Sequence, residues 1–220
     1  MKYAIVDLEM CKVPKAFRCE KYRYSQETIQ IGAVLLDEKY EIISRFNTYV
    51  KPQYGQIDSF INRLTGIGKA DVKDAPMMEE ALDMFLEWLP SQDVRCVSWS
   101  DSDNKQILHE IEAKEIRNGR LEEMLESWID CQKTFDDRMD SDKAFSLEMA
   151  LIAADIDTEG RQHDGLADAY NTALLFAKMQ KNPEFELHPA YQAAHEGKVE
   201  HLGYSLGDMF GGLLLQCVAG

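Results

Sequence analysis

The first predicted strand carries two acidic side chains near its C-terminal end. Residues 3–10 read Tyr-Ala-Ile-Val-Asp-Leu-Glu-Met, and Asp7 and Glu9 fall on one face because side chains alternate along a strand. Apolar residues on both faces predict a central strand, where two ionised acids are costly unless a cation or a water-filled cleft receives them. A D-x-E pair also commonly marks only the solvated end of a strand. A metal site at Asp7 and Glu9 therefore needs partners elsewhere in the chain.

The net charge limits which partners the protein can hold. The chain has 220 residues, which suits one α/β domain with additions or a domain with a small appendage. Its 24 basic and 39 acidic residues give a net charge of -15, which disfavours binding along a long polyanion. A metal cluster neutralised by its own acids, or a local basic patch, would overcome this repulsion because distant exposed charges are screened.

The sequence predicts a cytoplasmic protein without a membrane segment. No stretch approaches the ~20 apolar residues that a membrane helix needs, and the N-terminus shows no signal-peptide pattern. The five cysteines are odd in number and scattered, with no C-x-x-C pair. We expect reduced thiols in packing positions rather than a disulfide framework.

Residues 11–24 form a basic segment next to the two acids. It has a single acid, Glu20, and its aromatic residues are Phe17, Tyr22 and Tyr24. Such a mixture can follow phosphates and stack bases, and we expect Lys15 and Arg18 to contact substrate. A solvated loop between strands is an equally ordinary explanation, but the position beside Asp7 and Glu9 favours a function. The basic residues are Lys12, Lys15, Arg18, Lys21 and Arg23.

The next segments predict an antiparallel ladder followed by helices. Residues 27–37 and 41–50 are expected to be strands joined by a turn at 37–40, with the first strand in the same sheet. Residues 56–65 have helical spacing and Gly66 provides a stop, which leaves Leu64-Thr65-Gly66-Ile67 as a short apolar turn. A further helix is expected from an Asp74 cap to Pro90.

A second acidic junction follows the strand predicted at 94–99. Ser100-Asp101-Ser102-Asp103 leads into a helix whose Ile107, Leu108 and Ile111 are expected to face inwards. Asp103 can cap this helix, a role that is compatible with a second one. Residues 128–131 and 146–154 are expected to be a short buried strand and a helix of the scaffold.

A third polar junction, residues 160–164, enters a helix. His163 lies in the loop, Asp164 is the expected helix cap and Asp168 falls in the first turns. Residues 1–181 are therefore expected to form the domain. Residues 182–220 are expected to be a C-terminal extension, whose apolar stripe at 206–217 would dock on the domain or on a second copy as a homo-oligomer.

Four acids and one imidazole thus lie at the ends of predicted elements. Two divalent ions held by carboxylates can stabilise the attacking and leaving oxygens of a phosphodiester hydrolysis. Oxygen ligands favour Mg²⁺ or Mn²⁺, and a neutral histidine can accept a proton from the attacking water. The set is Asp7, Glu9, Asp103, His163 and Asp168.

Three of these segments resemble a known family. Asp7-Leu8-Glu9, the stretch from Trp99 to Asp103, and His163-x4-Asp168 are similar to the three motifs of the DEDDh branch of the DEDD 3′-to-5′ exonucleases. The strand at 29–34 and the turn at 64–67 are also similar. Within the family the likeness is to the Eri-type exoribonucleases, which include the 3′ histone-mRNA exonuclease and the KapD-like proteins, and it covers roughly residues 2–178.

The resemblance implies an α/β, RNase H-like fold with a mixed five-stranded sheet flanked by helices. It implies that Asp7, Glu9 and Asp168 hold one Mg²⁺ or Mn²⁺, that Asp7 and Asp103 hold the second, and that His163 is the general base. Nucleoside 5′-monophosphates would be released from a single-stranded 3′ end. Contacts to the terminal nucleotide would come from Met10, Leu64, Thr65, Ile67 and Trp99.

Two questions stay open at this point. Ser100 stands where the Eri-type pattern usually has glycine, so Asp101 competes with Asp103 as the metal ligand, although the spacing from Trp99 favours Asp103. The preference for RNA rests on the resemblance alone, because no residue identifies a contact to a 2′-hydroxyl. A DNA exonuclease is the near alternative, and a non-catalytic binding module is opposed by the presence of all five chemical positions.

Overall fold

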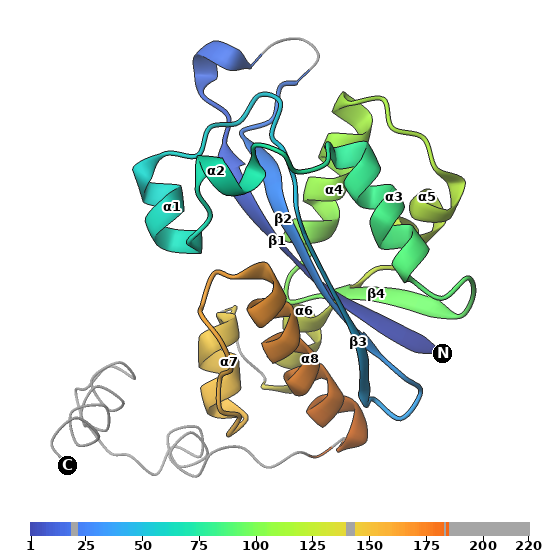
Figure 1. The fold of residues 1–220 in the computed structure, drawn as a ribbon. Helices are drawn as coiled ribbons and strands as arrows, with labels where there is room; N and C mark the ends of the chain where they lie inside the picture. Colours follow the sequence, from blue (N-terminus) through green and yellow to red (C-terminus); the bar gives the residue numbers. More distant parts are fainter. Residues whose placement is uncertain (19–21, 140–143, 183, 185–220) are drawn as a thin grey trace, which may run out of the picture. The chain divides into compact units, whose positions relative to one another are not determined.

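A mixed sheet of five strands forms the centre of the protein (Figure 1). The computed structural model describes all residues except 19–21, 140–143, 183 and 185–220. The strand order is β3-β2-β1-β4-β5, with β1 antiparallel to β2, β2 antiparallel to β3, and β4 parallel to both β1 and β5. The predicted central position of the first strand is confirmed. The strands are β1 (Lys2–Lys12), β2 (Gln26–Leu36), β3 (Ile42–Tyr49), β4 (Val94–Ser98) and β5 (Ile129–Asp130).

Helices occupy both faces of the sheet. The strands β1 and β2 are joined through a 3-10 turn, Lys15–Phe17, and β2 and β3 through the predicted tight turn, in which the amide of Tyr40 donates to the carbonyl of Asp37 over 3.0 Å. The helices are α1 (Ser59–Thr65), α2 (Lys69–Val72), α3 (Met78–Trp88), α4 (Ser102–Ala113), α5 (Gly119–Glu126), α6 (Cys131–Arg138), α7 (Leu147–Ala153) and α8 (Gly165–Lys181).

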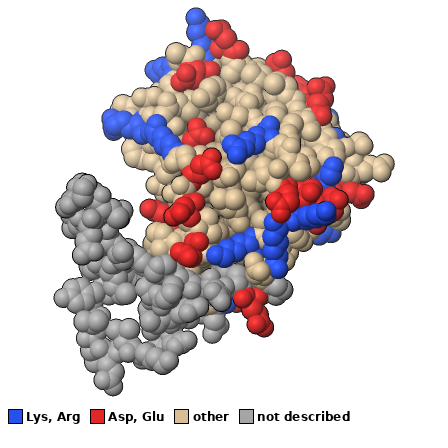
Figure 2. All heavy atoms as spheres, turned by 60° about the horizontal axis from the view of Figure 1, so that its bottom comes forward, with Lys and Arg blue, Asp and Glu red and all other residues tan. Residues whose placement is uncertain are grey.

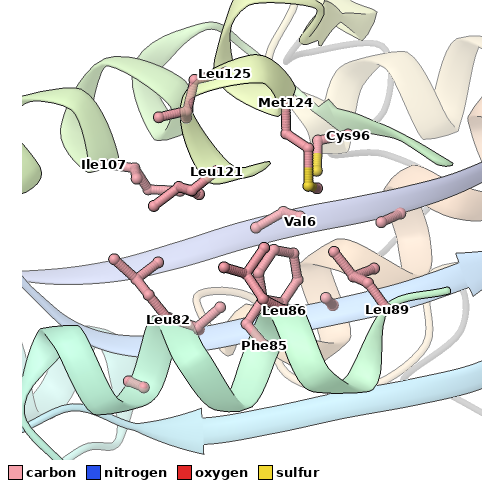
Figure 3. Packing of buried hydrophobic residues seen from close by; sticks show 14 of the residues in the cluster. Val6, Leu82, Phe85, Leu86, Leu89, Cys96, Ile107, Leu121, Met124 and Leu125 are labelled. Atoms are coloured by element: carbon pink, nitrogen blue, oxygen red, sulfur yellow. The ribbon is translucent and has the colours of Figure 1, made fainter. Parts of the chain in front are cut away.

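The main hydrophobic core lies between the sheet and α3, α4 and α5. Val6 of β1 points towards this core, between Phe85 of α3 and Leu121 of α5 (Figure 3). Burial of such side chains contributes about 1.5–3 kcal/mol each. The opposite face of β1 meets α8, where the rings of Tyr3 and Phe176 lie 5.1 Å apart. Asp7 and Glu9 share the face of Tyr3, so the two acids face α8.

Four details of the sequence prediction are wrong. The helix expected from Asp74 begins only at Met78, because Pro76 interrupts the segment between them. Leu108 is 42% exposed, since the inward stripe of α4 passes through Ile107 and Ile111. The N-cap position of α4 belongs to Asp101, and Asp103 lies buried in the first turn. The helices α5 and α6 were not predicted.

The remaining expectations are confirmed in part. In the described part of the chain, no helix is long and apolar enough to cross a membrane. Cys11, Cys96 and Cys131 are buried and free, as expected of packing thiols. The expected C-terminal extension, with its apolar stripe and its role in assembly, lies outside the described residues. The domain boundary at residue 181 stays a prediction.

Candidate active site

The C-terminal half of β1 brings two acids to the edge of a cleft. Asp7 and Glu9 line a cavity of about 750 Å³, and Glu9 is only 7% exposed. Between Glu9 and Met10 the pairing with β2 shifts by one residue, which is a β-bulge. Bulges redirect side chains and are frequent beside active sites. The unpaired residue is Ile29 of β2, and Met10 lines the same cleft as the two acids.

Asp103 completes this side of the cleft from the first turn of α4. It is 4% exposed, and its Oδ1 accepts a hydrogen bond of 3.0 Å from the backbone amide of Leu8, between the two acids of β1. Asp101 points away and forms an exposed ion pair of 2.5 Å with Lys105. The geometry thus favours Asp103 over Asp101 as the acid of the cleft, as the spacing from Trp99 predicted.

The loop before α8 supplies the histidine. The backbone of His163 is left-handed, with φ of 61°, which is uncommon outside glycine. This conformation directs its amide to Asp168, whose Oδ2 accepts a hydrogen bond of 2.9 Å. Asp164 caps the helix, as predicted, through bonds of 3.1 Å from the amides of Leu166 and Ala167. The loop and the first turn of α8 therefore hold His163 and Asp168 as a unit.

Glycines let α8 reach the sheet. A Cβ atom on Gly32 of β2 would lie 2.2 Å from the carbonyl carbon of Gly165, so the two backbones touch. The amide of Gly165 donates a bond of 3.1 Å to the side chain of Gln30, which in turn donates to Asn47 over 3.0 Å. The sequence prediction assigned no role to these residues. A glycine within an apolar strand is the signal of a close backbone approach that would have revealed the contact.

Burial, with repulsion between neighbouring carboxylates, raises the pKa of the cleft acids. Burial, followed by repulsion from Asp168 and Asp103, raises the pKa of Glu9 to about 8. Burial is the main cause that raises the pKa of Asp103 to about 7, and burial with repulsion from Asp103 raises that of Asp7 well above its usual range. The pKa of Asp168 is raised by burial, although the bond from His163 opposes the shift. Crowded, buried carboxylates of this kind are typical of sites that bind cations.

The donor set of the cleft suits a metal ion. Glu9, His163 and Asp168 offer one ligand atom each within 4.8 Å of one another. Asp7 and Asp103 line the same cleft but do not belong to this tightest group among the described residues. Because most of the donors are carboxylate oxygens, the chemistry favours a hard divalent cation, with His163 either a ligand or a neighbouring base.

The predicted substrate contacts fall into two groups. Met10, Leu64 and Trp99 line the cleft. The Trp99 indole packs on Phe135 with ring centroids 6.0 Å apart. The cleft also contains Phe60, which is 49% exposed and lies 5.0 Å below the Nζ of Lys12. Neither residue had been assigned to the site, although Lys12 belongs to the predicted basic segment.

The other predicted contacts lie away from the cleft wall. Thr65 and Ile67 are 4% and 3% exposed, and the hydroxyl of Thr65 closes the end of α1 by bonding both Ile61 and Ile67. Lys15 and Arg18 are exposed at the 3-10 turn and do not line the cavity. Their contacts to substrate stay a prediction.

The aromatic residues of the basic segment do not all face solvent. Tyr22 is fully buried and stacks on Tyr54 with centroids 4.8 Å apart, so its expected availability for base stacking is wrong. On the face shown in Figure 2, basic and acidic side chains are interspersed. That face has no broad basic surface.

Comparison with known proteins agrees with this geometry. The model of the exonuclease family matches residues 4–176. The chain belongs to the exonuclease family. The match covers β1 to α8 and thus all five residues of the cleft that carry the proposed chemistry. The predicted kinship with Eri-type members is confirmed by ERI1 exoribonuclease 2 of Danio rerio, which is 34% identical over 73% of this chain, and by that of Homo sapiens, 34% identical over 72%.

This member of the exonuclease family spans a minor part of those relatives' length. The matched region is 32% of the Danio rerio protein and 26% of the human one. A shorter segment, 29% of this chain, is 50% identical to 4% of the DNA polymerase III PolC-type protein of Caldanaerobacter subterraneus. Among solved structures, a similar one is the nuclease domain of 3′hExo, a DEDDh family member, bound to rAMP. The two structures superpose with a TM-score of 0.69 at 23% sequence identity, and the superposition covers 85% of this chain and 96% of the 3′hExo chain. The RNase H-like exonuclease fold is confirmed.

Proposed function

We propose that the protein is a metal-dependent 3′-to-5′ exoribonuclease that removes nucleoside 5′-monophosphates from single-stranded RNA. One observation carries this proposal: elements far apart in the sequence bring Asp7, Glu9, Asp103 and Asp168 to one cleft beside His163. The carboxyl pKa values, which burial and mutual repulsion raise, support a site whose ionised form is stabilised by a bound cation. A binding module without catalysis would not need this arrangement.

The four carboxylates would hold two Mg²⁺ or Mn²⁺ ions. When bound, such ions stabilise negative charge on the attacked phosphate and on the leaving oxygen. His163 would accept the proton of the attacking water as a general base, a role that histidine commonly has in catalysis. Asp168 fixes the loop of His163 through the backbone amide, so the side chain of His163 remains free for this task. Such proton transfer contributes about 10²–10⁴-fold to the rate.

The cleft offers a place for the terminal nucleotide. Leu64 and Phe60 provide apolar and aromatic surface on the α1 side, and Lys12 brings a cation over the Phe60 ring. A base can stack on such a ring with about 1–3 kcal/mol, and the ammonium can approach a phosphate. Met10, which lines the cleft beside Glu9, would contact the terminal sugar. These contacts favour a single strand, whose bases are free to unstack.

The preference for RNA is supported by the names of the relatives, which are exoribonucleases. A 3′-to-5′ DNA exonuclease is the second candidate, because a segment of the chain is 50% identical to a DNA polymerase III PolC-type protein. The same metal chemistry serves both substrates. The distinction lies in whether the site accepts a 2′-hydroxyl.

A time course with 5′-labelled single-stranded RNA and DNA of one sequence tests the proposal. We expect stepwise shortening from the 3′ end, only with Mg²⁺ or Mn²⁺, faster for RNA, and release of 5′-monophosphates. Faster degradation of DNA would select the second candidate. Binding of both strands without cleavage would select the non-catalytic module.

Compartment and assembly are further parts of this proposal. We propose a cytoplasmic location, which suits the free thiols of Cys11, Cys96 and Cys131. We also propose that residues 182–220 form a separate extension that mediates self-association. Light scattering of the full chain and of a chain ending at Lys181 would test this, and equal masses would reject it.

A further inference from the structure

One side chain connects the loop of His163 to α1. The guanidinium of Arg161 donates hydrogen bonds to the backbone carbonyls of Arg63 and Leu64, the latter over 3.2 Å. Its Nη1 also lies against Gly66, where an added Cβ would be 2.3 Å away. Gly66 is the left-handed residue that ends α1, with φ of 81°. Arg161 thus occupies the C-terminal end of α1, where helix carbonyls lack partners within the helix.

The two segments that Arg161 joins both line the same cleft. Gly160 and His163 line the cavity from the loop, while Ile61 and Leu64 line it from α1. The loop contains two left-handed residues, Gly160 with φ of 80° and His163 with φ of 61°. Its conformation therefore depends on contacts that hold it from several sides.

The other contacts of this loop belong to α8 and the sheet. The side chain of Asn171 accepts a bond of 2.9 Å from the amide of Glu159 and donates one of 3.0 Å to its carbonyl. The side chain of Asp168 accepts a hydrogen bond from the amide of His163, and the side chain of Gln30 accepts one from the amide of Gly165. These contacts keep the loop folded on its own helix. The bonds from Arg161 fix its distance from α1.

We propose that Arg161 is a positioning residue that holds the imidazole of His163 in register with the nucleotide bound against Leu64. The inference rests on the proposed exonuclease function. A loop that shifts by about 1 Å lowers the rate about 10²-fold, because the base no longer meets the attacking water in the right geometry. Arg161 itself does not line the cavity, so affinity for the substrate need not change.

The test compares Arg161→Ala with Arg63→Ala. The second variant removes a guanidinium from the same region but leaves the backbone carbonyl that Arg161 binds. We expect Arg161→Ala to lower kcat for single-stranded RNA by about 10- to 100-fold with KM within about twofold. Arg63→Ala should retain wild-type kcat. A rise in KM at unchanged kcat would instead identify Arg161 as a direct phosphate contact and would overturn the inference.

A double-mutant cycle with His163→Ala separates positioning from other roles. If Arg161 acts through His163, adding Arg161→Ala to His163→Ala changes kcat by less than about twofold, because coupled residues are not additive. An undiminished effect in that background rejects the inference. Arg161→Lys, which keeps one cationic donor, should recover part of kcat and replaces Arg161→Ala if the latter does not fold. Wild-type protein that fails to shorten RNA rejects the proposed function itself, whereas an active wild type with an equally active Arg161→Ala rejects only the positioning role.

Discussion

Gly32 of β2 and Gly165 of α8 are in direct backbone contact. A Cβ atom on Gly32 would meet the carbonyl carbon of Gly165 at 2.2 Å and the amide nitrogen of Leu166 at 2.3 Å. This approach places the start of α8 over the acids of β1, since Gly32 pairs with Asp7. The contact therefore determines how close Asp168 and His163 come to Asp7 and Glu9.

Gly32→Ala should accordingly destabilise the protein. The methyl group cannot be accommodated without moving α8, and overpacking of this kind costs about 1–3 kcal/mol or more. Gly119→Ala is the matched control, because nothing lies within 4 Å of a Cβ at the first residue of α5. Urea unfolding should show a lower midpoint for Gly32→Ala and an unchanged or slightly higher one for Gly119→Ala. Equal midpoints would contradict the close contact.

Stability without metal should fall as the pH rises. Burial raises the folded-state pKa of Glu9 to about 8 and that of Asp103 to about 7, above the ordinary carboxyl range of the unfolded chain. The folded protein therefore binds more protons than the unfolded one between about pH 5 and 8, so the free energy of unfolding decreases across this window. Thermal unfolding in EDTA measures the slope.

Two changes should reduce that slope. Saturating Mn²⁺ should raise the melting temperature more at pH 8 than at pH 5.5, since the cation replaces the protons. Asp103→Asn should flatten the dependence in EDTA. Asp101→Asn should flatten it much less, because Asp101 is exposed beside Lys105 and its repulsion is a minor cause of the raised pKa of Asp103. A melting temperature that rises with pH in EDTA would show that the acids are not crowded as described.

The choice between Asp103 and Asp101 can also be tested by activity. Asp103 is buried at the cleft and bonded to the amide of Leu8, whereas Asp101 forms an exposed ion pair, a type that contributes little. Asp103→Asn should lower kcat by more than about 100-fold through loss of charge stabilisation. Asp101→Asn should change it less than about twofold. The opposite ranking would return Asp101 to the metal site.

The basic segment gives a prediction about substrate length. Lys15 and Arg18 are exposed outside the cavity, so they can meet only nucleotides upstream of the 3′ end. The double variant Lys15→Glu, Arg18→Glu should raise KM for longer RNA, with little change for a dinucleotide. The KM of the variant for longer RNA should also depend less steeply on salt than that of the wild type, because two phosphate contacts are lost. Lys69→Glu, an exposed charge reversal on α2, is the control. An equal effect on both substrates would exclude a role along the strand.

Local patterns allowed much of the fold to be predicted. Apolar residues on both faces of the segment 3–10 predicted a central strand, and Asp164 with Gly66 predicted the start of one helix and the end of another. Propensity misled at Asp74, because a capping residue is also common in turns. Leu121, Met124 and Leu125 do have helical spacing, so α5 could have been predicted, whereas α6 is polar and buries only Cys131 and Phe135.

The grouping of Asp7, Glu9, Asp103, His163 and Asp168 in one cleft was predictable, because all five lie at the ends of elements. The supports of the site were not, because they depend on contacts between distant segments. Lys114, for example, is buried between Glu27 and Glu110, with ion pairs of 2.8 and 2.5 Å, and Glu27 also accepts amides from residues 53–55. No spacing in the sequence indicates that these three charges meet. The same holds for Arg161 and the carbonyl of Leu64.

The most direct test of the central claim is the cleavage of 5′-labelled single-stranded RNA by the wild type and by Asp7→Asn, with Mn²⁺ and with EDTA. Asp7 lies in the crowded set of acids, so loss of its charge should leave the metal-free melting temperature at pH 8 unchanged or higher. We expect metal-dependent shortening from the 3′ end by the wild type and none by the folded variant. Shortening by Asp7→Asn at the wild-type rate, or by the wild type in EDTA, would contradict this expectation.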